Sequence, residues 1–595
     1  MKLALIDWAV VVAFLGVSLT VGLALARRAG SSFREFFLSD RNMPWWLLGV
    51  SMVATTFSTD TPNLVTDIVR THGVAGNWVW WAFLLTGMVT TFVYARLWRR
   101  SGVETDIGFY ELRYSGPAAS FLRGFRAVYL GAFFNIMIMA SVTLAAIKIG
   151  SVLLGLPPVV IVVVAGSVTL AYSALGGLTG VLVTDLLLFV TAMVGSLAAA
   201  WTAVAHPEVG GLGALLAHPA VAPRLALLPD FADPTLALTV FVIPLAVQWW
   251  SVWYPGAEPG GGGYVAQRML AARSEGHALS ATLLFNVAHY ALRPWPWIVV
   301  GLASLLVFPD LESLRDAFPA VDPRVIGHDL AYPAMLTFLP AGLLGLVVAS
   351  LMAAYMSTIS THLNWGASYL VHDVYRRFID PEASERRLVR VGRLSTVGLM
   401  VVAGLVSLWL ENALQAFQIL LQIGAGTGLI FLLRWFWWRV NAASEVVAMV
   451  VSFLVAVHLQ FLHGRLFGAP LPGWQQLLIG VAVTTLAWLS TALLTRPADE
   501  ATLREFCRRI RPGGPGWGAV RRRALADGDP LPDGGGALPA GLLCAALGSI
   551  TVYAALFATG LALYGRTGAA LLLAAAGLLC GVVVARVASS SMRRV

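Results

Sequence analysis

Four hydroxyl side chains gather in one long apolar stretch that begins near Pro340. They follow Ala354 at close spacing and are Ser357, Thr358, Ser360 and Thr361. A hydroxyl without a partner in hydrocarbon costs free energy, so four of them require a bound ligand or hydrogen-bonding partners. Hydroxyl and carbonyl oxygens can replace the water around a small hard cation. We therefore expect a membrane helix that helps to bind sodium; the alternative is that each hydroxyl bonds the carbonyl one turn earlier.

Two ionisable side chains are expected deep in other apolar stretches. Asp185 lies within one of them. Burying a carboxylate in the membrane costs free energy, so an acid at such a position is expected to have a function. It is either an ion ligand or a structural acid that caps a helix or pairs with a base. Arg293 lies near the middle of another stretch, and its guanidinium stays charged at any ordinary pH. It faces either an anionic group of a solute, such as a carboxylate, or a fixed acidic partner, for which Asp60 and Glu258 are the candidates.

The composition indicates what kind of protein positions these groups. Of 595 residues, 58% are hydrophobic and 12% are charged, whereas a soluble protein has about 25% charged residues. The mean hydropathy is +0.77. The net charge of +9 comes from arginines in short loops, because Lys2 and Lys148 are the only lysines. This pattern predicts a multi-pass protein of the cell (inner) membrane, embedded in the lipid bilayer, and argues against nucleic acid as a partner.

Fifteen stretches have the roughly 20 apolar residues that a membrane-spanning helix needs. They are approximately 5–26, 44–66, 78–99, 120–149, 156–174, 178–203, 236–256, 278–307, 337–371, 390–410, 413–437, 444–463, 475–495, 538–563 and 567–587. If the N-terminus is outside, the arginine-rich loops all lie in the cytoplasm, and the odd number of spans leaves the C-terminus inside. The first stretch has features of a signal peptide, but Asp7 before it and Arg27 and Arg28 after it favour a retained helix.

Two of these spans are interrupted, and they lie five spans apart. The second carries a polar stretch from Thr55 to Pro62, and the seventh contains Pro244 and is followed by the glycines 260–263. This spacing is expected of inverted repeats whose broken first helices form a site near the middle of the bilayer. We therefore expect an all-α protein with a first repeat at 44–210 and a second at 211–440. The other segments are an N-terminal helix and loop at 1–43, two helices at 441–495, an Arg/Gly/Pro-rich cytoplasmic linker at 496–537, and two C-terminal helices with a tail at 538–595.

Several stretches, in order and at compatible distances, resemble the sodium/solute symporter family. They are Pro44-Trp45-Trp46, Gly176 to Val181 with Thr184-Asp185, Gln267-Arg268, Ala353 to Thr358 continuing through Asn364 and Asp373 to Arg377, and Arg434 to Asn441. The resemblance covers roughly residues 5–460 and extends to the sodium/sugar cotransporter-like branch, with the substrate subgroup unassigned. It implies a LeuT-like core of five-plus-five inverted repeats.

The resemblance also implies ligands for one sodium ion and for a second. The first site would use the backbone carbonyls of Ala54, Phe57 and Ala354 and the hydroxyls of Ser357 and Thr358. The second site, found in some family members, would use Asp185, Ser357, Ser360 and Thr361. The family often has a glutamine three residues after the aspartate, where this chain has Leu188.

The solute pocket is expected near the middle of the bilayer, between the broken spans and their neighbours. Its candidate lining residues are Thr56, Asp60, Trp80, Trp253, Tyr264, Arg293, Gln418 and Gln422. By resemblance, Tyr264 matches an inner-gate tyrosine of sugar-transporting relatives, although the polar pair that usually precedes it is Gly262-Gly263 here. Trp80 and Phe83 replace the acid and serine of galactose carriers, so a galactose carrier is not implied.

We expect sodium-coupled import of a small polar organic solute (a sugar, an amino acid or an organic acid) by alternating access. A proton-coupled carrier of the same fold and a solute-sensing receptor are the alternatives. An enzyme is not expected, since no nucleophile–base pair or metal-binding cluster is found at one membrane depth.

Overall fold

The computed structural model describes residues 3–593, apart from 30–32, 253–257, 320, 322, 324, 325, 411–420, 422, 423, 425, 470, 533, 535 and 536. Within these residues the chain is all-helical and forms no β-strand. The all-α class predicted from the sequence is confirmed.

Ten helices among the described residues are long and apolar enough to cross a membrane. They are Val74–Ser101, Gly116–Leu154, Gly177–Ala205, Glu275–Val307, Leu343–Ile379, Glu385–Ser407, Ala442–Phe467, Gly473–Leu494, Ala537–Leu563 and Thr567–Ser589. Four other expected spans contain shorter apolar helices, at Leu5–Ser18, Trp45–Thr55, Pro158–Ala171 and Pro234–Ala246. The expected span 413–437 lies partly outside the described residues. The count of fifteen and the sides on which the termini lie stay predictions.

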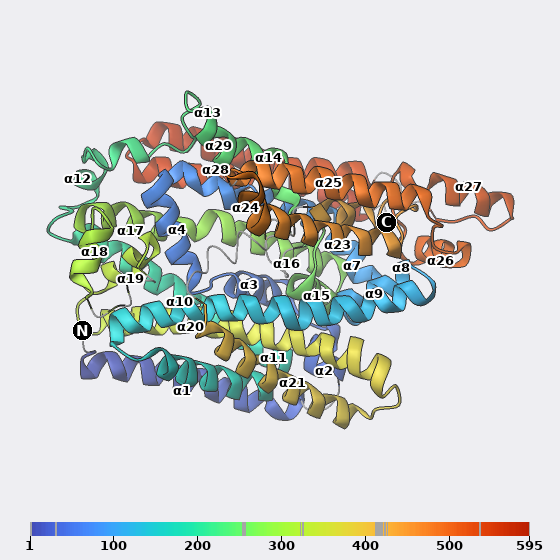
Figure 1. Ribbon diagram of the computed structural model, residues 1–595, viewed down its shortest axis with the longest axis horizontal. Helices are drawn as coiled ribbons and strands as arrows, with labels where there is room; N and C mark the ends of the chain where they lie inside the picture. Colours follow the sequence, from blue (N-terminus) through green and yellow to red (C-terminus); the bar gives the residue numbers. More distant parts are fainter. Residues whose placement is uncertain are drawn as a thin grey trace.

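The helices form three groups (Figure 1). Along one edge lie α1 (Leu5–Ala29), α11 (Pro158–Ala205), α20 (Leu343–Ser368) and α21 (Glu385–Ser407), with α10 (Asn135–Leu154) packed against α20 and α21. Toward the opposite edge lie α23 (Ala442–Val457), α25 (Gly473–Leu494), α28 (Ala537–Leu563) and α29 (Thr567–Arg593). Between them lie α3 (Trp45–Thr55), α4 (Asp60–His72), α15 (Gly263–Ala271), α16 (Glu275–Val287) and α17 (Pro294–Val307). Shorter helices include α2 (Phe33–Leu38), α5 (Trp78–Trp81), α6 (Leu84–Val89), α7 (Ala95–Ser101), α8 (Phe109–Arg113), α9 (Gly116–Val128), α12 (Leu212–Ala217), α13 (Pro234–Ala237), α14 (Ile243–Ala246), α18 (Leu311–Ala317), α19 (Ala331–Leu336) and α24 (His463–Phe467).

The first interruption lies where the polar stretch predicts it. Helix α3 ends at Thr55 and α4 begins at Asp60, so residues 56–59 leave the helical path inside the protein. Pro62 in the first turn of α4 has no N–H and is tolerated there because that turn has no intrahelical acceptor for it. Because α3 ends here, its last backbone carbonyls lack the N–H donors that a continuing helix would supply. The break therefore presents oxygens to its neighbours.

The second interruption follows α14. A short 3₁₀ turn at Gln248–Trp250 comes next, and the chain resumes a regular helix at Gly263 as α15. In between, the N–H of Val252 donates to the carbonyl of Gly424, 3.2 Å away. The expected pair of broken segments is thus present in the described parts of both regions.

Helix α11 joins two expected spans, 156–174 and 178–203, with a kink at Gly177. The φ angle of Gly177 is 55°, in the region that a glycine adopts without a steric penalty. The kink changes the direction of the second half of α11. Asp185 lies on this half, which packs against α3 and α20.

The segment expected as a linker contains two helices, α26 (Glu500–Ile510) and α27 (Gly518–Ala526). Trp517, which precedes α27, is buried, and its indole N–H donates to the carbonyl of Trp435 at 2.9 Å. The ring of Phe506 stacks on Trp517 with 5.2 Å between centroids. This segment therefore packs against the end of the helical bundle.

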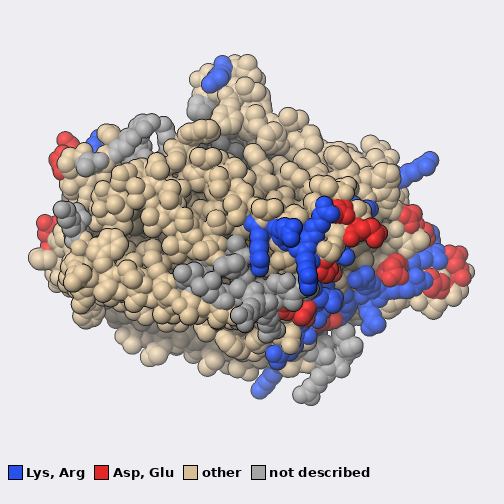
Figure 2. All heavy atoms as spheres, turned by 90° about the horizontal axis from the view of Figure 1, so that it is seen from below, with Lys and Arg blue, Asp and Glu red and all other residues tan. Residues whose placement is uncertain are grey.

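Charged side chains gather at the same end. Figure 2 shows most of the Lys, Arg, Asp and Glu side chains in the right half of the visible face and a few more at its left tip, with a broad stretch between them that is nearly free of charge. Such an uncharged belt suits contact with hydrocarbon. The arginine-rich loops that predict the topology include the loop between α7 and α9 and the segment that contains α26 and α27.

Candidate functional site

The first predicted sodium site lies where α20 meets the break after α3. The hydroxyl of Thr358 lies 2.7 Å from the carbonyl oxygen of Thr55 on the facing segment and 3.1 Å from that of Ala354 on its own helix. The N–H of Phe57 donates to the carbonyl of Ala54 at 3.0 Å, which closes a turn at the break. This hydroxyl contacts the carbonyl one turn earlier, as the alternative predicts, and it also bridges to the broken segment. Its role as a sodium ligand stays a prediction.

All five predicted ligands of this site are buried: Ala54, Phe57, Ala354, Ser357 and Thr358. They belong to two segments that are far apart in sequence and touch through Thr358. Neutral carbonyl and hydroxyl oxygens in such an arrangement suit a monovalent cation that must be released in each cycle.

Asp185 lies at the centre of a second polar cluster. One carboxylate oxygen accepts a hydrogen bond from Ser357 at 2.6 Å, and the other accepts a short hydrogen bond from Ser51 on α3. The side chain of Asp185 is fully buried. The acid thus links α11 to both α20 and α3, as expected of a structural acid. Its role as an ion ligand stays a prediction.

Arg268 on α15 also enters this cluster. Its Nη2 lies 4.0 Å from a carboxylate oxygen of Asp185, 3.1 Å from the hydroxyl of Ser51 and 2.8 Å from the hydroxyl of Thr361. Its Nη1 donates to Gln267 at 2.9 Å. A guanidinium therefore lies beside two of the four ligands predicted for the second sodium ion, Asp185 and Thr361.

The fourth predicted ligand is directed differently. The hydroxyl of Ser360 donates to the carbonyl of Ser357 on its own helix at 3.1 Å. Sequence reasoning assigned neither Ser51 nor Arg268 to this site. The one signal in the sequence was that Arg268 follows closely after the second break. Its stretch, Gln267-Arg268, was recognised only through the resemblance to the family.

A cavity beside the first break contains four of the predicted solute-binding residues. It has a volume of about 110 Å³ and is lined by Thr55, Thr56, Ser58, Asp60, Thr61, Leu64, Val65, Trp80, Phe83, Ile138, Ser141, Val142, His289, Tyr290, Arg293 and Thr358. The wall of the cavity therefore includes the broken segment and Thr358. Trp253, Gln418 and Gln422 lie outside the described residues.

Arg293 is held at one side of this cavity. Its guanidinium donates to the carbonyl of Thr56 and lies 2.6 Å from Nδ1 of His289. It also lies over the rings of Phe57 and Trp297, at 5.7 and 5.3 Å from their centroids. These contacts fix the guanidinium next to the break.

The two acids considered as fixed partners of Arg293 lie in different places. Glu258 forms ion pairs with Arg126 and with Arg434 in a separate buried cluster. Asp60 lines the same cavity as Arg293. Its Oδ1 is buried and has no hydrogen-bond partner among the described residues.

Tyr264, the predicted inner-gate residue, lies on α15 beside the second cluster. The guanidinium of Arg268 lies over its ring at 5.6 Å, and the ring of His362 is 6.1 Å away. In sugar-transporting relatives the matching tyrosine can contact a side chain of the second span, which is Thr56 here. The hydroxyl of Thr56 lies 2.9 Å from Nδ1 of His289.

Several known proteins have sequences similar to that of this chain. The sequence model of the sodium:solute symporter family matches residues 36–452. The sodium/glucose cotransporter of Vibrio parahaemolyticus is 25% identical over 515 residues, which cover 84% of this chain and 92% of that protein. A sodium/mannose cotransporter of Bos taurus is 26% identical over 498 residues, covering 78% of this chain and 80% of that protein.

Among solved structures, the fold is similar to the substrate-bound outward-open state of a Na⁺-coupled sialic acid symporter. The TM-score is 0.66 at 22% sequence identity, over 83% of this chain and 99% of that chain. The likeness supports the predicted LeuT-like fold of the core.

Proposed function

The chain belongs to the sodium:solute symporter family, which makes it a multi-pass membrane transporter and not an enzyme, and we propose that it imports a polar organic acid together with sodium. One observation carries the proposal. The broken segment at residues 55–58 and Thr358 both line the solute cavity, and Thr358 also bridges that segment to α20. An ion bound between α20 and the break would therefore contact residues that also line the solute cavity. Ion binding and solute binding would then depend on each other, as coupled transport requires.

At the first site, sodium would be held by the carbonyls of Ala54, Phe57 and Ala354 and by the hydroxyls of Ser357 and Thr358. Ser357 suits this role because its hydroxyl oxygen can coordinate a cation while its O–H donates a hydrogen bond to Asp185. The ion would hold the break against α20 in the outward-facing state. Its release on the cytoplasmic side would loosen the solute cavity, as alternating access requires.

A second sodium ion would be held by Asp185 with Ser357, Ser360 and Thr361. Arg268 lies 4.0 Å from that carboxylate, so a sodium ion bound to Asp185 would lie close to a like charge. Two like unit charges about 4 Å apart repel by about 4 kcal/mol at an effective dielectric constant of about 20. Sodium and the guanidinium would therefore occupy the cluster in alternation. We propose that Arg268, with α15, moves away when the second ion binds.

The cavity favours a solute that carries a carboxylate and a hydrogen-bond donor. Arg293 offers a fixed guanidinium, which recognises carboxylates well. The unpartnered Oδ1 of Asp60 would accept a hydrogen bond from a hydroxyl or ammonium group of the same solute. Trp80, whose ring stacks on Tyr290 with 5.9 Å between centroids, supplies an aromatic wall for the carbon skeleton. A hydroxy acid, an acidic sugar or an amino acid has this chemistry.

The free energy for import would come from sodium moving inward. Each ion contributes roughly 2.3 kcal/mol per 100 mV of membrane potential, before its concentration gradient is counted. Two ions would double this contribution and would allow steeper accumulation of a solute whose negative charge opposes entry.

A screen of purified protein would identify the solute. Sugars, amino acids and organic acids are tested for thermal stabilisation in sodium and in choline. We expect a carboxylate-bearing compound to stabilise the protein only in sodium. Stabilisation by neutral sugars alone would reject the proposed cargo class, and stabilisation that is independent of sodium would reject the proposed coupling.

The role of Arg293 is tested by comparing the acid with its neutral amide in uptake assays. In wild-type protein the acid should be strongly preferred. Arg293→Gln should remove that preference and raise KM for the acid roughly tenfold or more, as expected for losing a charged hydrogen bond. Arg315→Gln, on exposed helix α18, is the matched control. Retained preference for the acid in Arg293→Gln would show that Arg293 is only structural.

A further inference from the structure

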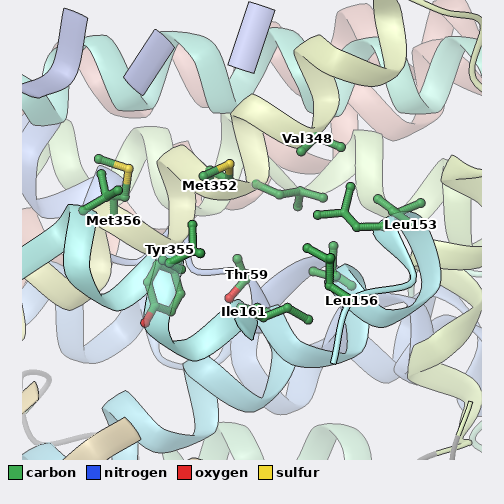
Figure 3. Close-up of a pocket in the computed structure, with 16 residues that line it drawn as sticks. Thr59, Leu153, Leu156, Ile161, Val348, Met352, Tyr355 and Met356 are labelled. Atoms are coloured by element: carbon green, nitrogen blue, oxygen red, sulfur yellow. The ribbon is translucent and has the colours of Figure 1, made fainter. Parts of the chain in front are cut away.

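A second cavity lies on the far side of α20 from the Asp185 cluster and is almost wholly apolar. It lies between α10, the first half of α11 and α20 and has a volume of about 100 Å³. Figure 3 shows its labelled side chains around a common open space. Its lining residues are Thr59, Ala146, Ile149, Gly150, Leu153, Leu154, Leu156, Ile161, Val164, Ala165, Val168, Val348, Leu351, Met352, Tyr355 and Met356.

Among the described residues, the cavity presents no free hydrogen-bonding side chain to an occupant. Of its described lining residues, only Thr59 and Tyr355 have polar side chains. The hydroxyl of Thr59 donates to the carbonyl of Val142 at 3.0 Å, and that of Tyr355 lies 3.3 Å from the hydroxyl of Thr143. Water and polar solutes would find no partner here, because buried water needs several polar groups. The chemistry of the lining selects hydrocarbon.

The cavity is continuous with the surface that faces the bilayer. Val164 lines it and is 50% exposed, and Val160 and Val163 beside it on α11 are 40% and 58% exposed. In a membrane transporter, such a row of exposed valines contacts lipid tails. The same helix therefore forms both the lipid-facing surface and one wall of the cavity, so a lipid tail reaches it without crossing a polar layer.

We propose that an acyl chain of a bilayer phospholipid inserts into this cavity between α10, α11 and α20. None of the described lining residues is charged, so the hydrocarbon tail is recognised and the headgroup is not. The tail would contact Met356, which directly precedes Ser357 on α20, and Thr59, two residues after Phe57. Its place is therefore directly behind the two segments that meet at the first sodium site.

The proposal is tested with a phosphatidylcholine that carries a diazirine near the end of one acyl chain. The full-length protein is reconstituted in vesicles containing this lipid and illuminated, and the labelled residues are mapped by mass spectrometry. We expect labels on the cavity-facing residues of α10 and α20, and the same pattern with a phosphatidylglycerol probe. Labels confined to outward-facing residues such as Val163 would overturn the proposal, and so would a pattern that depends on the headgroup.

Paired variants make the test specific. Ala165→Trp places a large ring in the cavity and should abolish labelling of the α20 wall, whereas Val163→Trp, on the lipid-facing side of the same helix, should leave it unchanged. If Ala165→Trp does not yield folded protein, Val168→Phe serves the same purpose. Equal labelling of the α20 wall in the blocking and control variants would overturn the proposal.

A second measurement follows stability in delipidated, detergent-solubilised protein. Added phosphatidylcholine should raise the melting temperature of the wild type and of Val163→Trp by more than that of the blocking variant, in which the ring already fills the space. Equal shifts in all three proteins would count against an occupied cavity.

Discussion

The guanidinium of Arg268 lies 4.0 Å from the carboxylate of Asp185, and both side chains are fully buried. The two residues belong to α15 and α11, so this contact joins the helix after the second break to the helix that carries the acid. Ser51 and Thr361 both receive hydrogen bonds from the same guanidinium. Movement of α15 would change the charge that faces Asp185, which links the second predicted ion site to the region of the inner gate.

Arg268→Gln should make the protein's stability depend more strongly on sodium. Removing one partner of a buried charge pair destabilises by about 3–5 kcal/mol because the other charge is left alone. At Asp185, sodium can replace the lost guanidinium and restore part of that stability. Melting temperature measured against sodium concentration, without solute, checks this.

The matched control is Arg126→Gln, which removes a buried partner of Glu258 away from the sodium sites. It should be destabilised in sodium and in choline alike. If sodium rescued both variants equally, or neither, Arg268 and sodium would not share Asp185.

Asp185→Asn should reduce the number of coupled sodium ions from two to one. The amide keeps the size of the side chain and one of its two acceptor oxygens but loses the charge that makes this cluster attractive to a cation. The Hill coefficient of solute uptake against sodium concentration should fall from near two toward one. A wild-type coefficient of one that is unchanged in the variant would remove the second ion from the mechanism.

Thr358→Val should weaken sodium and solute binding together. The variant keeps the shape of the side chain but loses the hydroxyl that contacts Thr55 and Ala354. Loss of one hydroxyl ligand should lower the apparent sodium affinity about tenfold, which corresponds to about 1.4 kcal/mol. Isothermal binding of the solute at several sodium concentrations measures both effects.

Ser368→Ala serves as the control for this variant, because the Ser368 hydroxyl only bonds the carbonyl of Trp365 on its own helix. It should leave both affinities unchanged. If Thr358→Val altered solute affinity without altering sodium affinity, Thr358 would be a solute residue and not an ion ligand.

The loop between α7 and α9 should give the protein a pH-dependent stability near neutrality. Burial raises the pKa of Asp106 to about 7, although it accepts hydrogen bonds from Tyr369 and from the N–H of Gly263. A raised pKa means that the folded state holds the proton more tightly than the unfolded state. Its contribution to stability is therefore full below pH 3.8, the ordinary pKa of this group, and is lost as the pH rises toward about 7.

Asp106→Asn should flatten this dependence, since the amide does not ionise and can still accept from Gly263. Melting temperatures at pH 5 and pH 8 should differ less in the variant than in the wild type. Asp316→Asn, at an exposed position on α18, should behave like the wild type. An unchanged difference in Asp106→Asn would assign the pH dependence to other groups.

The sequence predicted the features that have a local cause. The break at residues 56–59 follows from Pro62 and the polar residues around it, and the hydroxyls of α20 are conspicuous because they interrupt an apolar stretch. Asp185 and Arg293 were recognised because charge is rare in such stretches. Each of these signals is read within a few residues.

The contacts that complete the sites have no local signal. Ser51 lies 134 positions before its partner Asp185, and only the packing of α3 against α11 brings the two together. Arg268 reaches the same acid because α15 follows a break whose path the sequence does not define. For the same reason the sequence does not define the number of spans, since broken segments form helices shorter than a complete span.

The central claim is that sodium, held between the break after α3 and α20, prepares the solute cavity. Equilibrium binding of the carried acid to purified protein in sodium, potassium and choline tests it most directly. We expect high-affinity binding in sodium alone, with a marked loss in Thr358→Val. Equal affinity in the three salts would contradict the account.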